Sequence, residues 1–442
     1  MAGSVFDSAL FARLFPTGEA GRLFSDAAEV RAMMLVEGTL AKVQGEMGII
    51  PEDSAFFIHR AAMEIPLDPA GLAEATGQNG VNVPGLVAAF RKAMEAPEHA
   101  QFVHWGATSQ DIIDSALMLR LRQLLGQAEA GLKAVLTPMR TLAEAHAETP
   151  MVARTFGQHA SLTSFGAQVA EWGNPLISLL EDLPDLRAKT LIVSVSGAAG
   201  TAAAYGPRAA ELRGRMAAAL NLGDPGRDWH GDRTPVLRIA DWLGRVNLAL
   251  AKIGEDLIAM AMSGIGEVDL GGGGGSSTLP QKQNPVMASA LVALAHQARG
   301  LQATLQAGAV QKHQRDGAAW FAEWLALPQI CLGAASALQL AARQMAVLAP
   351  RADVMARAAA EPLQLIHAEA LSYALCAAMR RPEAQDASKA LCREAQASGV
   401  PLQALAARDH PDLDLAAIFD PGRQMGHAPE AARRFAERVA AI

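Results

Sequence analysis

The sequence predicts an all-α fold of three domains with a long central helical bundle. Alanine is abundant, aromatic residues make up only 5% of the 442 residues, and alternating runs of β-branched residues are scarce. Hydrophobic residues reach 51% and charged residues 19%, as in a chain that buries a large core. The chain is longer than one compact domain, and its longest apolar patterns have the period of a helix.

The two outer domains, residues 1–108 and 351–442, are predicted to hold short helices separated by turns. The first contains "IIPEDS", "LDPAG" and "TGQNG", which combine residues that favour turns. The second is divided by "SGVPLQ", "RDHPDL" and "FDPGRQ" in the same way. No internal repeat is visible in the sequence.

The central domain, residues 109–350, carries the long helical patterns. From Arg233 to Met262 apolar residues recur every three or four positions, which predicts one helix with a single apolar stripe. The same period predicts three further helices, over 111–146, 163–189 and 287–310. The helix over 163–189 is expected to break at Pro175. Helices of this length favour an extended bundle, and their broad apolar faces indicate packing against other subunits.

Composition and charge exclude several classes of function. The formal charge of −7 provides no basic surface for nucleic acid or an anionic membrane. The N-terminus lacks the segments of a signal peptide, and no window reaches the ~18 uncharged apolar residues that span a bilayer. The cysteines, Cys331, Cys376 and Cys392, show no CxxC spacing and are expected to be reduced. These features predict a cytoplasmic protein that binds neither nucleic acid nor a membrane.

The least ordinary stretch is "GGGGGSSTLPQKQNP", Gly271 to Pro285. It is not a Walker loop, because Lys282 lies between two glutamines and does not follow a glycine. It is not a dinucleotide fingerprint, because a helical pattern precedes it where a strand is needed. A surface linker would explain the glycines alone, but the lysine, asparagine and hydroxyl side chains suit a carboxylate and a proton transfer. We therefore expect a loop with glycine hinges, Gly271 to Gly275, that closes over a substrate.

Four more polar clusters precede predicted helices. In "HWGATSQDIID", Ser109 is placed to cap a helix, and the same hydroxyls and N–H groups suit an anion. The others are "ARTFGQHASLT", "RDWHGDRTP" with His230, and "KHQRDGAAWFAEW" with Arg315. An arginine such as Arg315 binds a carboxylate through two parallel hydrogen bonds. Taken alone, His159 is explained better by a structural role than by a functional one. The histidines lack HExxH spacing, so no metal site is predicted.

The chain resembles the fumarase/aspartase superfamily. The segments "HWGATSQDIID", "ARTFGQHASLT" and "GSSTLPQKQNP" carry the resemblance, and the last is similar to the signature GSSxMPxKxNP. Their order and spacing agree over nearly the whole chain. The resemblance implies a mostly helical homotetramer whose active sites are each shared between three subunits. It also implies β-elimination or its reverse beside a substrate carboxylate, without a cofactor.

Within the superfamily, the chain is most similar to the bacterial 3-carboxy-cis,cis-muconate lactonizing enzymes. Many superfamily members carry a histidine where "ARTFGQ" has Phe156, and this subfamily has an aromatic residue there. The segment "HQRDGAAWFAEWLALPQI" also resembles the subfamily's sequence. The resemblance implies a cycloisomerase acting on a small polycarboxylate. An argininosuccinate- or adenylosuccinate-type lyase that releases fumarate is the alternative, and a catalytically silent structural protein is a more remote one.

The resemblance also implies a role for each candidate residue. Ser276 is the proton-transfer residue, and Lys282 and Asn284 hold the carboxylate whose negative charge grows during the reaction. The substrate supplies its own nucleophile, so Phe156 is tolerable where a lyase needs a titratable side chain. The residues expected to bind substrate are His104, Thr108, Ser109, Gln110, Arg154, Thr155, Gln158, His159, His230 and Arg315. Two glutamines flanking Lys282, and Trp105, depart from the subfamily pattern and leave the exact substrate open.

Overall fold

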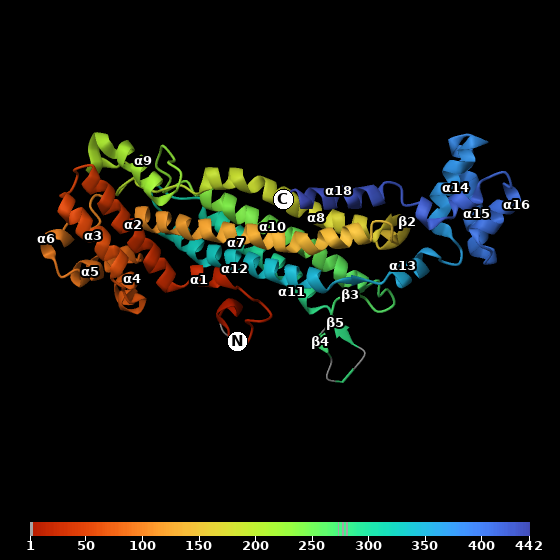
Figure 1. The fold of residues 1–442 in the computed structure, drawn as a ribbon, viewed down its shortest axis with the longest axis horizontal. Helices are drawn as coiled ribbons and strands as arrows, with labels where there is room; N and C mark the ends of the chain where they lie inside the picture. The colour runs from red at the N-terminus through yellow and green to blue at the C-terminus, as the bar shows by residue number, and fades with distance from the viewer. Residues whose placement is uncertain (1–2, 273, 276–277, 280–281) are drawn as a thin grey trace. The chain divides into compact units, whose positions relative to one another are not determined.

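The computed structural model describes residues 3–272, 274–275, 278–279 and 282–442, and helices dominate it, which confirms the all-α prediction (Figure 1). Ser276 lies outside the described residues, so its predicted role is not addressed by the geometry below. The chain divides into two compact units. Unit 1 comprises residues 1–131, 179–248 and 293–340, and unit 2 comprises residues 132–178, 249–292 and 341–442.

Five long helices each contribute residues to both units. They are α7 (Ser109–Ala145), α8 (Phe165–Thr190), α10 (Thr234–Met260), α11 (Val286–Gly308) and α12 (Gly317–Val347). Four of them, α7, α8, α10 and α11, match the four predicted ranges to within about three residues at each end, the usual uncertainty of a helix boundary. The predicted three-domain boundaries near 108 and 350 fall where α7 begins and soon after α12 ends, and the division into three domains stays a prediction.

The predicted break at Pro175 is wrong, because α8 continues through this residue. A proline inside a helix removes one N–H donor and crowds the preceding turn, which costs about 3 kcal/mol. Trp172, Leu176 and Ile177 around it are all buried. Burial of this apolar face outweighs the local cost of the proline, as is usual for a helix stabilised by tertiary packing.

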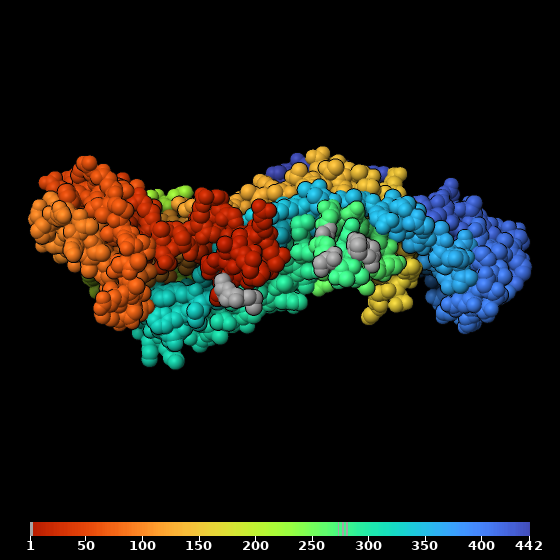
Figure 2. All heavy atoms as spheres, turned by 90° about the horizontal axis from the view of Figure 1, so that it is seen from below, coloured from red at the N-terminus to blue at the C-terminus, as the bar shows by residue number. Residues whose placement is uncertain are grey.

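The N-terminal part of unit 1 consists of short helices around one core. They are η1 (Val5–Asp7), α1 (Glu19–Leu23), α2 (Asp26–Glu46), α3 (Glu52–Glu64), η2 (Pro69–Leu72), α4 (Ala73–Asn79), α5 (Val83–Ala93) and α6 (Pro97–Ala100). Helices α2 to α6 lie together in both views (Figures 1 and 2). Met33, Ile58, Leu86 and Phe90 are fully buried between them. Later in the chain, η3 (Ala203–Arg208) and α9 (Ala209–Leu220) pack on the same core.

Unit 2 contains a β-hairpin that the sequence analysis did not predict. Its strands, β1 (Pro150–Thr155) and β2 (Gln158–Ser164), are antiparallel with Thr155 opposite Gln158. Two smaller antiparallel pairs join β3 (Val268–Asp269) to β6 (Ala349–Pro350) and β4 (Gly274–Gly275) to β5 (Gln283–Asn284). The hairpin places Arg154, Gln158 and His159 on paired strands rather than on a loop before a helix.

The C-terminal part of unit 2 is a series of short helices, drawn in blue in Figures 1 and 2. They are α13 (Ala352–Ala359), η4 (Leu365–His367), α14 (Ala368–Ala374), η5 (Leu375–Ala377), α15 (Arg381–Ser398), α16 (Leu402–Asp409), α17 (Leu415–Ile418), η6 (Pro421–Arg423) and α18 (Ala428–Ala440). The helices from η4 to α17 form a group with its own core. The three predicted turn segments separate α15, α16, α17 and α18. The core of this group is formed by Leu371, Leu391, Leu402 and their neighbours.

Helix α12 is long and apolar enough to cross a bilayer by length and composition, which the sequence analysis did not foresee. However, 61% of its most apolar stretch is buried inside the protein. A buried core helix has this composition because it contacts other helices on several sides.

Candidate active site

Unit 1 brings together three of the predicted substrate-binding residues. The Arg315 Nε donates a hydrogen bond of 2.7 Å to Gln110 Oε1. Its Nη2 donates at 3.4 Å to Thr108 Oγ1 and at 3.4 Å to the carbonyl oxygen of Ala198. Arg315 itself is exposed, and Thr108 and Ser109 are half-buried. The cluster therefore holds a guanidinium and two hydroxyls at the surface, close to the start of a long helix.

The start of α7 shapes this cluster. The helix begins at Ser109, so the cap position falls on Thr108, one residue before the predicted cap. Asp111 lies in the first turn, and its Oδ2 accepts a hydrogen bond of 3.1 Å from the Thr108 backbone N–H. A carboxylate in the first turn is stabilised by the partial positive charge of the helix N-terminus. The turn that carries Thr108 is thus held by a hydrogen bond to a side chain in the first turn of α7.

Gln110 and His230 are buried beneath this exposed cluster. Gln110 is 2% exposed, and its Nε2 donates to the His230 carbonyl oxygen at 3.1 Å. The His230 ring is 1% exposed, with Nε2 3.0 Å from Asp111 Oδ1 and Nδ1 3.3 Å from Asp228 Oδ1. We predicted that the His230 ring contacts the substrate. In this conformation the ring has no exposed surface for such a contact, and both of its nitrogens already face carboxylates.

His104 lies on the loop that leads to Thr108 and forms a pair with Glu37 from α2. The His104 Nδ1 is 2.7 Å from Glu37 Oε1, and Glu37 is 1% exposed. Burial alone lowers the pKa of His104, but the charge and hydrogen bond of Glu37 outweigh it, so this pKa is raised above its usual 6.5. A protonated His104 would add a positive charge to the loop.

Backbone strain gathers at the segments that carry these residues. His104, Phe156, Ala202 and His313 all have a positive φ, between 51° and 62°, although none is glycine. This left-handed conformation costs a non-glycine residue about 1–2 kcal/mol and is commonest at binding and catalytic sites. Each of the four adjoins or belongs to a segment that the sequence analysis or the Arg315 contacts singled out.

The hairpin of unit 2 holds four more predicted residues. The Arg154 Nη1 donates to Glu267 Oε2 and the Nη2 donates to Glu267 Oε1, both at 2.8 Å, and Glu267 is fully buried. Thr155, Gln158 and His159 are exposed. Arg154 therefore anchors the hairpin with its terminal nitrogens, and the neighbouring polar side chains remain open to solvent.

Phe156 and Gly157 form the two-residue turn of this hairpin. Both have a positive φ, 52° and 73°, as a type I′ turn requires. Phe156 is fully exposed, with an exposed fraction of 105%. A bulky residue in a left-handed turn with an exposed ring is unfavourable on both counts.

Gly275 and Gln283–Asn284, at the two ends of the signature segment, lie on the β4–β5 pair. Lys282 is exposed and Asn284, opposite Gly274, is half-buried. Gly271 has a φ of 73°, and a Cβ there would lie 2.5 Å from the Val347 side chain, so glycine is needed at this point. Gly273, like Ser276, lies outside the described residues, and the predicted closure of the segment stays a prediction.

The absence of a metal site stays a prediction. Within residues 3–272 and the other described ranges, no group of three His, Cys, Asp or Glu side chains could hold a metal ion. The three cysteines are free thiols, and Cys331 is buried.

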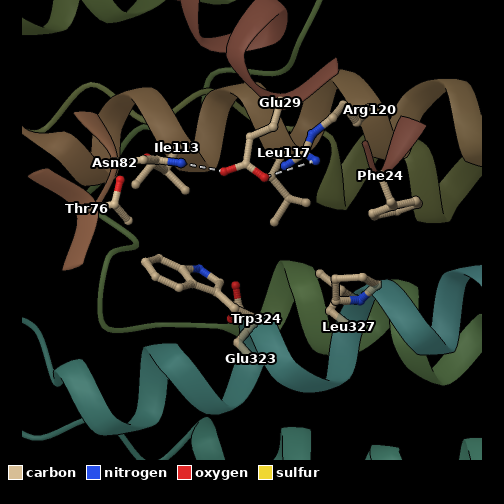
Figure 3. Close-up of a pocket in the computed structure, with 11 residues that line it drawn as sticks. Phe24, Glu29, Thr76, Asn82, Ile113, Leu117, Arg120, Glu323, Trp324 and Leu327 are labelled. Atoms are coloured by element: carbon tan, nitrogen blue, oxygen red, sulfur yellow. Dashed lines mark hydrogen bonds and ion pairs between the residues drawn. The ribbon is translucent and has the colours of Figure 1, made fainter. Parts of the chain in front are cut away.

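The cavity drawn in Figure 3 is separate from the predicted residues. It measures about 240 Å³ in unit 1, and its 11 lining residues include none of the predicted substrate-binding residues. Glu29 lies between Asn82 and Arg120 on one wall, and Trp324 and Glu323 form the other (Figure 3). Two carboxylates and one guanidinium do not favour a polycarboxylate, so this cavity is not our candidate active site.

Several residues of the candidate site were missed at the sequence level. They are Glu37, Glu267 and the segment Ser194–Gly200, whose "SVSGAAG" combines small residues with two glycines. Gly197 and Gly200 have positive φ values. The run of small residues before "AAYGP" was therefore the sequence signal that could have indicated this segment. Asp111 was placed correctly at the positive end of a helix, but its bonds to distant segments have no local sequence pattern.

The chain is similar to known proteins over nearly its whole length. A family model described as "Lyase" matches residues 58–300. The 3-carboxy-cis,cis-muconate cycloisomerase of Pseudomonas aeruginosa is 34% identical, over 98% of this chain and 96% of that protein. The chain belongs to this lyase family. The N-acetyl-S-(2-succino)cysteine lyase of Enterococcus italicus is 29% identical over 81% of this chain and 79% of its own.

Membership of the lyase family extends to the whole fold. The crystal structure of a 3-carboxy-cis,cis-muconate lactonizing enzyme from Pseudomonas putida matches with a TM-score of 0.91 and 32% identity. The match covers 98% of this chain and 99% of that one. The resemblance to the superfamily is therefore confirmed, and the likeness extends along nearly the full chain.

Proposed function

We propose that the protein is a 3-carboxy-cis,cis-muconate cycloisomerase that forms 4-carboxymuconolactone, in the protocatechuate branch of the β-ketoadipate pathway. The observation that carries the proposal is the full-length similarity, in sequence and in fold, to enzymes bearing that name. The exposed aromatic ring of Phe156 supports it, since a lyase that removes a proton would use a titratable side chain at that turn.

In this reaction one substrate carboxylate adds to a carbon of the conjugated chain, and a proton reaches the neighbouring carbon. Before that proton arrives, the electron pair displaced by the addition places extra negative charge on a second carboxylate. Lys282 and Asn284 are proposed to hold that carboxylate, because a cation and an N–H donor stabilise the charge where it develops. Ser276 is proposed to transfer the proton. The step needs no metal and no enzyme base to activate the nucleophile, because the nucleophile is already an ionised carboxylate.

Arg315, Thr108 and Ser109 are proposed to bind a substrate carboxylate that does not react. Arg315 is held by Gln110 through Nε, and its Nη1 makes no hydrogen bond within the described part of the chain. A guanidinium fixed at one edge and open at another suits a carboxylate, because little side-chain entropy is lost on binding. Gln158 and His159, exposed on β2, are proposed to complete the pocket.

The protein is proposed to act as a cytoplasmic homotetramer whose active sites are shared between three subunits. Exposed apolar side chains on the long helices support an assembly. Leu325 of α12 is 70% exposed, and Phe321 of α12 and Leu248 of α10 are 42% and 39% exposed. Sedimentation equilibrium would measure the mass, and a monomer at micromolar concentration would contradict this proposal.

A pair of assays with a Ser276→Ala variant tests the function. The wild type should consume 3-carboxy-cis,cis-muconate, followed as loss of its absorbance, and should release no fumarate from argininosuccinate or adenylosuccinate. Ser276→Ala should lower kcat by about 10²–10⁴-fold with an unchanged melting temperature, because one proton donor is removed. Fumarate release by the wild type would favour the lyase alternative, and a near-normal kcat for the variant would remove Ser276 from the mechanism.

A further inference from the structure

The Asp111 carboxylate is the centre of a buried hydrogen-bond network in unit 1. Its Oδ1 accepts from the Ser196 N–H at 2.8 Å, and its Oδ2 accepts from the Gly197 N–H at 2.9 Å and from the Thr108 N–H at 3.1 Å. The Ser194 hydroxyl donates to Oδ1 at 3.2 Å. The fifth contact, 3.0 Å long, joins Oδ1 to His230 Nε2.

The chemistry of these contacts requires an ionised carboxylate. An ionised aspartate offers acceptor sites on both oxygens and no donor, which matches a set of donors on both sides. Burial raises the pKa of Asp111, but the hydrogen bonds and charge of His230 and the backbone N–H groups outweigh it, so this pKa is lowered. Asp111 is 2% exposed, so its partners are groups of this chain.

The segments joined by Asp111 are the ones that contact Arg315. Thr108 contributes its Oγ1 to Arg315, and Ala198, next to Gly197, contributes its carbonyl oxygen. His230 adds a second connection, because its carbonyl oxygen accepts from Gln110, the 2.7 Å partner of Arg315 Nε. Each of the three groups that hold Arg315 is therefore bonded to Asp111 or His230, or neighbours a residue that is.

We propose that Asp111 and His230 are positioning residues that set Arg315 and Thr108 for the substrate carboxylate. Neither is exposed, so both act through the Thr108 turn, the Ser194–Ala198 segment and the Gln110 side chain. This inference rests on the proposed function only in taking Arg315 and Thr108 as carboxylate-binding groups. It replaces the direct substrate contact that the sequence analysis expected of His230.

Asp111→Asn is the sharpest variant, because it keeps the shape and removes the charge. The amide of the variant places an N–H₂ group next to backbone N–H donors that had a carboxylate oxygen as their partner. Because two donors cannot bond to each other, the Thr108 turn or the Ser194–Ala198 segment must move. The matched control is Asp256→Asn in unit 2. The Asp256 side chain is 26% exposed and pairs with Lys252, and its Oδ2 accepts hydrogen bonds from Trp172 Nε1 at 2.6 Å and from Gln168 Nε2 at 3.2 Å.

The measurement is the affinity of the whole enzyme for tricarballylate, a tricarboxylate that cannot react, by calorimetry. Asp111→Asn should weaken binding by about tenfold or more, as expected for losing charge-assisted hydrogen bonds, and Asp256→Asn should change it less than about twofold. Arg315→Gln should weaken binding too. Because Asp111 acts through Arg315, Asp111→Asn in the Arg315→Gln background should then add less than about threefold.

Two results would overturn the proposal. The first is an equal loss of tricarballylate affinity for Asp111→Asn and Asp256→Asn, or fully additive losses of affinity for Asp111→Asn and Arg315→Gln. Either would show that Asp111 contributes to stability alone. If Asp111→Asn does not fold, His230→Asn is measured in the same cycle, since it leaves the backbone bonds of Asp111 in place; no loss of affinity there would also overturn the proposal. Tricarballylate binding does not require turnover, so a failure of the cycloisomerase assay is a separate result.

Discussion

The predicted site residues of the two units are held in different ways. In unit 1, Arg315 and Thr108 rest on buried polar groups, Asp111, Gln110 and His230, that come from two distant segments. In unit 2, Thr155, Gln158 and His159 are exposed on short strands, and Lys282 is exposed just before β5. The main anchor among the described residues of the hairpin is the Arg154–Glu267 pair.

The difference shows how much of a binding site one chain can preorganise. The unit 1 cluster has its geometry set by interlocked hydrogen bonds, so a carboxylate meets groups already in place. The unit 2 groups have few partners of their own, and Phe156 at the turn has a bare ring. The proposed sharing of a site between subunits would supply further partners for them. The three predictions below test this contrast, from the largest effect to the smallest.

The largest loss of stability is expected for Arg233→Met in unit 1. Arg233 is 2% exposed and donates at 2.7–2.9 Å to Asp114 and Glu323, both buried. Without the guanidinium, two buried carboxylates face each other unpaired, which should lower the free energy of unfolding by about 3–5 kcal/mol or more. Urea unfolding measures it.

Arg238→Met is the control for this variant. Its pair with Asp185, at 3.2 Å, is largely exposed, so its loss should change the free energy of unfolding little. Similar losses for the two variants would mean that the buried network of unit 1 is no more important than a surface pair.

An intermediate loss is expected for Arg154→Met in unit 2. Glu267 is fully buried, whereas the Arg154 side chain is 25% exposed, so solvent screens part of the pair. We expect a loss of about 2–3 kcal/mol, below the range for a fully buried pair. The double variant Arg154→Met, Glu267→Gln should regain part of it, because it no longer leaves a buried charge unpaired. A double variant as unstable as the single one would refute that explanation.

The smallest effect is a pH-dependent one, at the His104–Glu37 pair of unit 1. The folded pKa of His104 is raised above 6.5, so its pairing stabilises the fold fully below pH 6.5 and is lost as pH rises through the folded value. Glu37→Gln should therefore lower the free energy of unfolding, by about 1 kcal/mol, more at acidic than at alkaline pH. Unfolding at a series of pH values measures the trend.

The control for the pH series is Glu46→Gln, in an exposed pair with Lys42 at 3.9 Å. It should show no such trend between pH 5.5 and 8.5, roughly the range over which a histidine titrates. A loss for Glu37→Gln that grows with rising pH would contradict the sign derived from His104.

Much of the fold was predictable because its signal is local. From Val236 to Met260 apolar residues recur every three to four positions, and this period predicts a helix from neighbouring residues alone. The turn segments around α15 to α17 are predictable for the same reason, since proline and glycine limit the backbone directly. The β1–β2 hairpin was missed, because its polar residues read as a cluster before a helix and its turn, Phe156-Gly157, lacks the usual asparagine or aspartate.

The amino-acid sequence thus determined the helix positions and the polar clusters, which depend on neighbours a few residues apart. Only the tertiary structure decided that α8 continues through Pro175, that His230 is buried, and that Asp111 joins Thr108 to Gly197. These outcomes depend on groups about 80 to 120 residues apart along the chain. A hydrogen bond or buried surface between such groups is decided by folding as a whole, because no local preference is strong enough to specify its partner.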